Sequence, residues 1–442
     1  MWGTKRNIMM PSIEQSILAL IDQSKDELID LTRQMIRIPT ENKQTIGGER
    51  ECQFFLADRF KEFGFSTDIF TPLDVAGIEE HPYFVPGRDY INRPNVVATL
   101  KGNGSGKSLI ISGHIDVCAK EPMIWKHDPF GAEIENGRIY GRGSLDMKGG
   151  LAAGIIAMKV LFEAGVKLNG SLYLESVVDE EGSGAGSLSC ILRGYRADAV
   201  IIPEPTNMKV CPASMGEKYM RITIQAEHNK QYFGGGLNDI NPVYGIAKII
   251  DALYIFDKKR NQIQQENIHP LYRNVSNPLA ISIEQLKAGD VGVPGAFGIP
   301  VSSWMLVSMR IFPGTTEAEF EKELSSFLEP IIEREPILKR NPPVISDEAH
   351  FLHPHEIDPD HAIVKTLSES FEQVCKKPAR VEGAPFACDG FLFDKYGHMP
   401  VVILGPGGEN AHAADEYVNI EDLINLAKIY ALTIMNWCGY ST

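Results

Sequence analysis

Short apolar segments that alternate with helical patterns constrain the fold of this chain most strongly. We expect strands at residues 95–100, 108–113, 171–178, 199–202 and 400–405, and helices at 148–164, 186–193 and 420–437. Such alternation indicates βαβ units and a mainly parallel sheet with helices on both faces. The predicted fold class is therefore α/β.

The N-terminal region is predicted to be helical. Residues 12–36 carry apolar side chains at helical spacing, with Ser12 as the N-cap and Pro39 beyond the end. A second helical pattern covers residues 49–64. We expect both helices to pack on the sheet.

Two domains are expected, because 442 residues with 43% hydrophobic composition exceed what one compact core usually holds. The sheet pattern stops near residue 213, and an α+β module follows, with strands at 219–227 and 302–312 and helices at 242–256 and 316–333. The polar stretch 258–267 is predicted to be a solvated helix end or loop. We predict a discontinuous domain, 1–213 and 333–442, interrupted by an insert at 214–332.

The charge and cysteine content narrow the choice of partners. The net charge of -15 disfavours nucleic acid and anionic membranes. Seven cysteines are scattered without a CxxC pair, which is typical of reduced thiols in a cytosol. The longest apolar run, near residues 151–162, is too short to span a bilayer, and no cleavable signal is evident. We expect a cytoplasmic protein whose substrate is a small molecule or short peptide.

Residues suited to metal binding follow four of the predicted strands. His114, the pair Glu180 and Glu181, Glu204 and His412 each stand at or shortly beyond a strand end. Because open α/β sheets bind ligands beyond the carboxyl ends of their strands, we expect these side chains to converge at one edge. The sequence therefore predicts a ligand-binding site there.

The residue types indicate two metal ions. Asp146, at the start of the helix after GRGSLDMKGG, can reach the same edge. Imidazole and carboxylate ligands suit zinc, with cobalt or manganese as alternatives. Five ligands for two ions require a bridge, and a carboxylate such as Asp146 can span ions about 3.5–4 Å apart.

The adjacent pair Glu180 and Glu181 can perform two different tasks. Successive side chains leaving a strand point to opposite sides, so one can bind metal while the other acts as general base on the metal-bound water. Asp116 lies two residues beyond His114 and can accept its second imidazole N–H.

Each residue also has a simpler interpretation. A histidine after a strand can be an ordinary loop residue, Asp146 can be only an N-cap, and His412 can belong to an exposed acidic turn with Asp415 and Glu416. The segment GRGSLDMKGG lacks the GK[ST] ending of a phosphate-binding loop. The joint occurrence of these residues at strand ends favours a metal centre.

The chain resembles the dinuclear zinc hydrolases that include aminoacylases, acetylornithine deacetylase, succinyl-diaminopimelate desuccinylase and bacterial glutamate carboxypeptidase. Five motifs carry this resemblance in order: SGHIDV, GRGSLDMKGG, VVDEEGSGAG, IIPEPT and GPGGENAHAADEYV. The resemblance covers nearly the whole chain and implies an α/β catalytic domain with an inserted lid.

The resemblance also implies roles for the individual residues. His114 and Glu204 would hold one ion, and Glu181 and His412 the other. Asp146 would bridge them; Glu180 would be the base and Asp116 would support His114.

For the insert, the resemblance implies a lid that forms a homodimer. Arg310, in SMRIFPGTT, fits the position of an arginine that binds a substrate carboxylate. The simpler interpretation of Arg310 is a surface salt bridge. The family's usual lid histidine would fall on Lys230, and His228 lies two residues earlier. Either side chain can stabilise an oxyanion.

The sequence therefore predicts a zinc-dependent hydrolase of linear amides. A metal-bound hydroxide would attack a small N-acyl amine or N-acyl amino acid, with Glu180 as base. The alternatives are a dipeptidase or carboxypeptidase-like peptidase, and a non-hydrolytic metal-binding paralogue that binds a ligand or partner.

Overall fold

The chain divides into two compact units in the computed structural model, which describes residues 12–43, 45–226, 241–290 and 300–441. The first unit comprises Met1–Pro212, Ile357–Val381 and Leu392–Thr442. The second comprises Ala213–Glu356 and Glu382–Phe391. The predicted insert, 214–332, is therefore too short at its C-terminal end.

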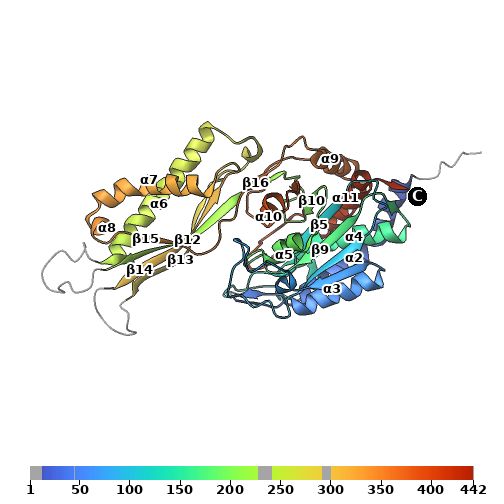
Figure 1. Ribbon diagram of the computed structural model, residues 1–442, viewed down its shortest axis with the longest axis horizontal. Helices are drawn as coiled ribbons and strands as arrows, with labels where there is room; N and C mark the ends of the chain where they lie inside the picture. Colours follow the sequence, from blue (N-terminus) through green and yellow to red (C-terminus); the bar gives the residue numbers. More distant parts are fainter. Residues whose placement is uncertain (1–11, 44, 227–240, 291–299, 442) are drawn as a thin grey trace, which may run out of the picture. The chain divides into compact units, whose positions relative to one another are not determined.

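A six-stranded sheet forms the centre of the first unit (Figure 1). Its order is β17 (Val401–Ile403), β10 (Val200–Ile202), β5 (Leu109–His114), β9 (Leu172–Val177), β4 (Asn95–Leu100) and β3 (Ser66–Phe70). The first four strands are parallel, and β4 and β3 are antiparallel to their neighbours. The predicted α/β class is confirmed, with an antiparallel pair added at one edge.

Helices cover both faces of this sheet. One large buried core joins one face to α1 (Ile13–Gln23), α2 (Lys25–Arg37), α3 (Arg50–Glu62), α4 (Gly149–Glu163), α9 (Ala362–Cys375) and α11 (Ile420–Cys438). The helix α5 (Ala185–Arg193) lies on the other face, because Asn95 donates hydrogen bonds to Gly186 and Ser189 of α5 while its neighbour Val96 points into the large core.

The N-terminal helical region differs from the prediction in one respect. Ser12 caps α1 as expected, because its hydroxyl accepts a hydrogen bond from the Gln15 backbone N–H. The single helix predicted over 12–36 is wrong, since α1 ends at Gln23 and α2 begins at Lys25, with Ser24 between them. Ser24 donates its hydroxyl to the Leu20 carbonyl, a bond that competes with helix continuation.

A smaller sheet brings two distant loops together. Its order is β18 (Gly408–Glu409), β19 (Tyr417–Asn419), β7 (Arg138–Tyr140) and β6 (Glu133–Glu135). The chain continues from β7 into the segment that carries Asp146, and His412 lies between β18 and β19. Pairing of β19 with β7 therefore fixes both loops in one place.

The second unit has the predicted α+β composition. Its sheet has the order β13 (Ile281–Asp290), β14 (Ser302–Ile311), β12 (Gly216–Gln225) and β15 (Val344–Asp347), and α6 (Pro242–Glu266) and α7 (Glu317–Arg334) share its core. Because β15 pairs with β12, the unit continues beyond residue 332. The polar stretch 258–267 is part of α6 up to Glu266, with Asn267 as C-cap.

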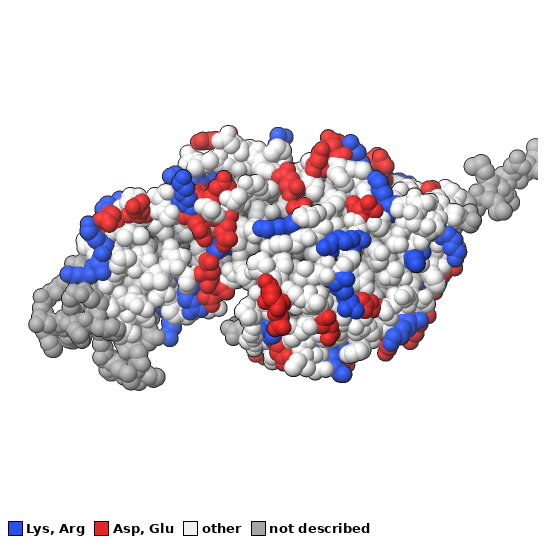
Figure 2. Space-filling view, in the orientation of Figure 1, with Lys and Arg blue, Asp and Glu red and all other residues white. Residues whose placement is uncertain are grey.

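The remaining elements are short: β1 (Asn42–Lys43), β2 (Ile46–Gly47), η1 (Pro72–Asp74), η2 (Ser144–Lys148), β8 (Lys167–Leu168), β11 (Ala213–Ser214), η4 (Pro270–Tyr272), α8 (Pro336–Arg340), β16 (His355–Glu356), α10 (Gly390–Lys395) and β20 (Tyr440–Ser441). Within the described part of the chain, no helix combines the length and apolarity needed to cross a membrane. Figure 2 shows acidic and basic side chains interspersed over the visible face.

Candidate metal centre

The carboxyl ends of three adjacent parallel strands carry the first predicted ligands. His114 is the last residue of β5, Glu204 lies two residues beyond β10, and Glu180 and Glu181 follow β9. Because β5 lies between β10 and β9, these ends are neighbours at one edge of the sheet. The convergence arises from parallel pairing, as expected for an open α/β sheet.

One group of side chains surrounds His114, which is 1% exposed. Its Nε2 atom lies 3.2 Å from Asp146 Oδ1 and 3.3 Å from Glu204 Oε1. Glu180 Oε2 is 3.9 Å from the same nitrogen. The carboxylates of three separate segments thus face one imidazole nitrogen.

A second group surrounds His412, whose Nε2 atom lies 3.1 Å from Asp146 Oδ2 and 3.1 Å from Glu181 Oε1. Asp146 therefore directs one carboxylate oxygen toward each histidine. This is the arrangement that a carboxylate bridging two ions requires.

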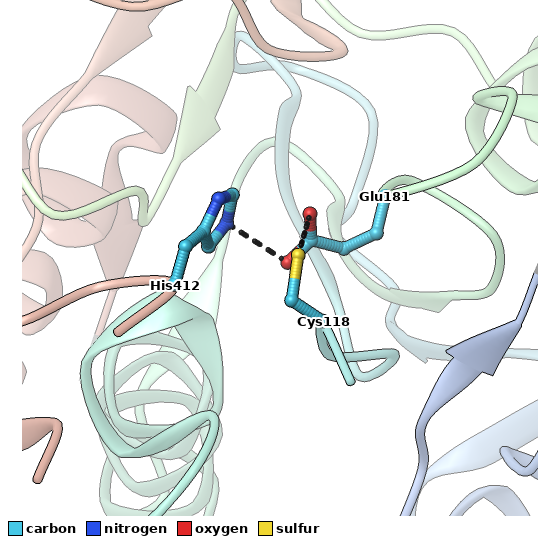
Figure 3. Close-up of side chains that lie close together, drawn as sticks. All are labelled: Cys118, Glu181 and His412. Carbon is cyan, nitrogen blue, oxygen red and sulfur yellow. Dashed lines mark hydrogen bonds and ion pairs between the residues drawn. The ribbon is translucent and has the colours of Figure 1, made fainter. Parts of the chain in front are cut away.

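Cys118 belongs to the second group and was not predicted. Its Sγ atom lies 3.1 Å from Glu181 Oε2, and Cys118, Glu181 and His412 offer ligand atoms within 4.8 Å of one another (Figure 3). Its position in the sequence contains a signal that could have identified it. His114, Asp116 and Cys118 follow one another at a spacing of two residues, the same alternation that predicted Asp116.

Asp116 supports His114 in a different way from the one predicted. The Nδ1 atom of His114 lies 2.8 Å from the backbone carbonyl oxygen of Asp116, and the carboxylate oxygen is farther, at 3.7 Å. The carboxylate instead accepts hydrogen bonds from the backbone N–H groups of Glu180 and Glu181 and from the Asn42 amide. The residue thus orients the imidazole through its backbone and the Glu180–Glu181 turn through its side chain.

The loop that carries Asp146 is held by Glu416, which was considered only as part of an exposed turn. Glu416 is buried, and its carboxylate accepts hydrogen bonds from the backbone N–H groups of Gly143, Leu145 and Asp146. It also pairs with Arg142 at 2.8 Å. Because Glu416 lies four residues after His412, this contact couples the two loops of the centre.

A buried network of charges lies beside the Glu180–Glu181 turn, and we call it the arginine network. It consists of Glu49, Arg88, Arg93 and Asp179. Arg93 contacts Asp179 at 2.8 Å, and Arg88 holds the same carboxylate through two nitrogens. Burial opposes ionisation of Asp179, but the hydrogen bonds from Arg88 and the charge of Arg93 hold its pKa below the usual range.

The pKa values at the centre show how strongly the carboxylates act on the imidazoles. Burial alone would lower the pKa of His114, but Asp146 and Glu204 raise it well above its usual value. Burial would raise the pKa of Asp146, yet hydrogen bonds from His114 and His412 lower it. Burial and the charge of Asp146 raise the pKa of Glu204 to about 8. The cluster carries excess negative charge, which a bound cation would neutralise.

The donor set fits two divalent ions. Four carboxylates and two imidazoles from five chain segments meet in one place, and these are oxygen and nitrogen ligands that zinc accepts. Glu181 Oε1 is buried and makes no hydrogen bond of normal geometry among the described residues. Its neighbour is the His412 imidazole at 3.1 Å, and a metal ion at this place would satisfy the oxygen.

The predicted lid residues belong to the second unit. Arg310 is half-buried on β14, opposite Glu217 of β12. Burial raises the pKa of Glu217, and the positive charge of Arg310 acts against this shift. Lys230 and His228 lie outside the described residues. The substrate-binding roles of all three residues stay predictions.

Comparison with known proteins gives a family and a relative. The model described as "Peptidase family M20/M25/M40" matches residues 110–436. A protein of Bacillus subtilis (strain 168), named N-formyl-4-amino-5-aminomethyl-2-methylpyrimidine deformylase, is 31% identical over 451 aligned positions, covering 97% of this chain and 99% of the relative.

Solved structures are similar in fold. The di-peptidase Dug1p of Saccharomyces cerevisiae matches with a TM-score of 0.74 and 17% identity, over 97% of this chain and 99% of that one. A dinuclear metal-binding peptidase of the M20 family from Bacillus subtilis matches with a TM-score of 0.60 and 16% identity, over 94% and 99%. At these identities the likeness concerns the fold.

Proposed function

The chain belongs to peptidase family M20/M25/M40 and is a metal-dependent hydrolase of amide bonds. We propose that it removes a formyl group from a small heteroaromatic amine. The observation that carries the proposal is the 31% identity to the Bacillus subtilis deformylase over nearly the full length of both chains. A protein of Halalkalibacterium halodurans with the same name, 28% identical, supports it further.

We assign the general base to Glu180. Its carboxylate lies at the His114 side of the cluster, 3.9 Å from His114 Nε2, while Glu181 faces His412 at 3.1 Å. The two neighbours thus point to different places, which supports separate roles. Glu180 accepts a proton from the attacking water and returns it to the departing amine nitrogen, so the amide C–N bond breaks and formate and amine are released.

We assign His114 and Glu204 to one ion, Glu181 and His412 to the other, and Asp146 to both. When bound, two divalent ions polarise the amide carbonyl and lower the pKa of the attacking water. Zinc is the metal that the ligand types favour, and cobalt or manganese can replace it.

We further propose a cytoplasmic homodimer in which the second unit forms the lid and the dimer contact. All seven cysteines are free thiols, which supports a reducing compartment. The dimer is supported by the family resemblance alone. Light scattering on the purified protein measures it directly, and a mass of one chain, 49.0 kDa, at micromolar concentration would refute it.

A panel of amides tests the proposed substrate. The zinc-loaded protein is assayed on the formyl, acetyl and succinyl amides of one aminomethylpyrimidine, on N-acyl amino acids and on dipeptides. We expect kcat/KM for the formamide to exceed that for the acetamide by about 10–200-fold, because a pocket that fits hydrogen at the acyl carbon rejects an added methyl group.

The same panel separates the alternatives. Faster hydrolysis of dipeptides or N-acyl amino acids, lost in Arg310→Ala, would identify a peptidase or aminoacylase that binds a carboxylate. Binding of two metal ions without hydrolysis of any amide would identify a non-hydrolytic paralogue. Either result would overturn the deformylase proposal.

A further inference from the structure

The thiol of Cys118 lies inside the cluster that faces the second metal ion, and none of the assigned roles uses it. Figure 3 shows contacts of the Glu181 carboxylate with both the thiol and the imidazole of His412. Its Oε2 atom is 3.1 Å from Cys118 Sγ, and its Oε1 atom is 3.1 Å from His412 Nε2. We propose that Cys118 is a thiolate ligand of the ion held by Asp146, Glu181 and His412.

The separations agree with a shared ion. Zinc lies about 2.0–2.3 Å from nitrogen, oxygen and sulfur ligands, so ligand atoms at tetrahedral angles are about 3.3–3.8 Å apart. The ligand atoms of Cys118, Glu181 and His412 all lie within 4.8 Å of one another. The two printed separations of 3.1 Å are slightly shorter than this range, so small shifts of the side chains around an ion would bring all three into its coordination shell.

Glu181 provides an independent indication of a ligand at this point. Its side chain is only 8% exposed, and among the described residues its Oε1 atom has no hydrogen-bond partner of normal geometry, although His412 Nε2 is 3.1 Å away. The two side chains pair directly, and both are of a type that binds zinc. The thiol of Cys118 lies 3.1 Å from the other oxygen of the same carboxylate, so the three side chains border one place.

The backbone holds Cys118 in position before any ion binds. The preceding residue, Val117, donates its N–H to the Thr40 carbonyl and accepts a hydrogen bond from the Asn42 N–H. Val117 is also fully buried. Metal binding therefore need not reorganise this segment, which favours a preformed ligand.

The ligation step is a simple exchange. The S–H bond of Cys118 breaks, a bond forms between sulfur and the metal ion, and the proton passes to solvent. No electron transfer is involved. A thiolate makes the second site softer than a site of carboxylates and imidazole alone, so it favours zinc or cadmium over manganese or magnesium.

Cobalt spectroscopy tests this ligand without using substrate turnover. The metal-free protein is titrated with two equivalents of Co²⁺, and a sulfur-to-cobalt charge-transfer band in the near ultraviolet is expected. Cys118→Ser should lack this band and bind the second ion at least about 10-fold more weakly. Cys375→Ser, which alters another half-buried thiol of the first unit, should retain it.

Calorimetry in buffers of different ionisation enthalpy provides a second measurement. Binding of two zinc ions to the wild type should release one more proton than binding to Cys118→Ser. Two bound Co²⁺ ions without the charge-transfer band, or a band that persists in Cys118→Ser, would overturn the proposal. Cys118 would then be only a hydrogen-bond donor to Glu181, and the proposed hydrolysis would be unaffected.

Discussion

Two buried clusters of charge lie side by side in the first unit, and they are neutralised differently. In the arginine network, the carboxylates of Glu49 and Asp179 meet the guanidinium groups of Arg88 and Arg93. In the metal centre, four carboxylates meet only two imidazoles. The carboxylates belong to Asp146, Glu180, Glu181 and Glu204, and the imidazoles to His114 and His412.

The difference shows where the chain depends on an external cation. A buried carboxylate is costly unless it is paired, so the arginine network satisfies this requirement with residues of the chain. The metal centre leaves negative charge in excess. Asn42 connects the two clusters, because its amide donates to both Asp116 and Asp179. We infer that the arginine network keeps the turn of Glu180 and Glu181 in position for the ions.

The largest effect is expected at Asp146, the one carboxylate shared by both histidine groups. Asp146→Ala should reduce the metal content from two ions to one or none and lower turnover by at least about 1,000-fold, because the bridge is lost. Elemental analysis and steady-state kinetics measure both quantities. Asp58→Asn, at an exposed position of α3, serves as control.

This prediction also tests the contrast between the clusters. If Asp146→Ala kept two ions and full turnover, the excess of carboxylates would not serve metal binding.

The next effect is expected in the arginine network. Asp179→Asn removes the carboxylate charge that Arg88 and Arg93 share in a buried place, and should lower the free energy of unfolding by about 3–5 kcal/mol. Added zinc should not restore this loss. Urea unfolding with and without zinc provides the measurement.

Asp68→Asn is a matched control for that variant. The carboxylate of Asp68 accepts hydrogen bonds from Arg193 and Tyr195, as that of Asp179 does from Arg88 and from Tyr90, but Asp68 is partly exposed. Its replacement should cost less than about 1 kcal/mol. Equal losses for the two variants would contradict the importance of burial in the arginine network.

A smaller effect is expected at Glu175, a buried carboxyl group on β9 that is neutralised by its own proton. Burial raises its pKa from 4.5 to about 8, so the unfolded chain ionises first and the free energy of unfolding falls as pH rises from about 4.5 to about 8. Glu175→Gln removes this contribution. The variant should gain stability relative to wild type, on the order of 1–3 kcal/mol between pH 5 and pH 8.

Thermal unfolding across this pH range measures the gain. A difference between the two proteins that stays constant with pH would show that Glu175 does not carry a raised pKa.

The sequence predicted those parts of the centre that depend on local pattern. His114 and Glu204 follow apolar strands directly, so sheet pairing alone brings them together. The support of Glu416 for the Asp146 loop could not be predicted, because it connects residues about 270 positions apart. Cys118 was missed although its spacing from His114 indicated the same side of the chain.

The same distinction between local and distant contacts explains the errors in the fold. Five of the six strands of the central sheet were predicted from their apolar runs, which are local, and the edge strand β3 was missed. The second unit was predicted to end at 332, but β15 joins its sheet through pairing with β12 more than a hundred residues earlier. The split between α1 and α2 falls at Ser24, inside a helical pattern that continues on both sides of it.

The most direct test of the account is Glu180→Gln, measured for metal content and for turnover of the formamide. We predict two bound ions per chain, as in wild type, and turnover reduced by at least about 100-fold, because the variant cannot accept the proton of the attacking water. Two bound ions with unchanged turnover would contradict the assignment of Glu180 as the base and with it the proposed mechanism.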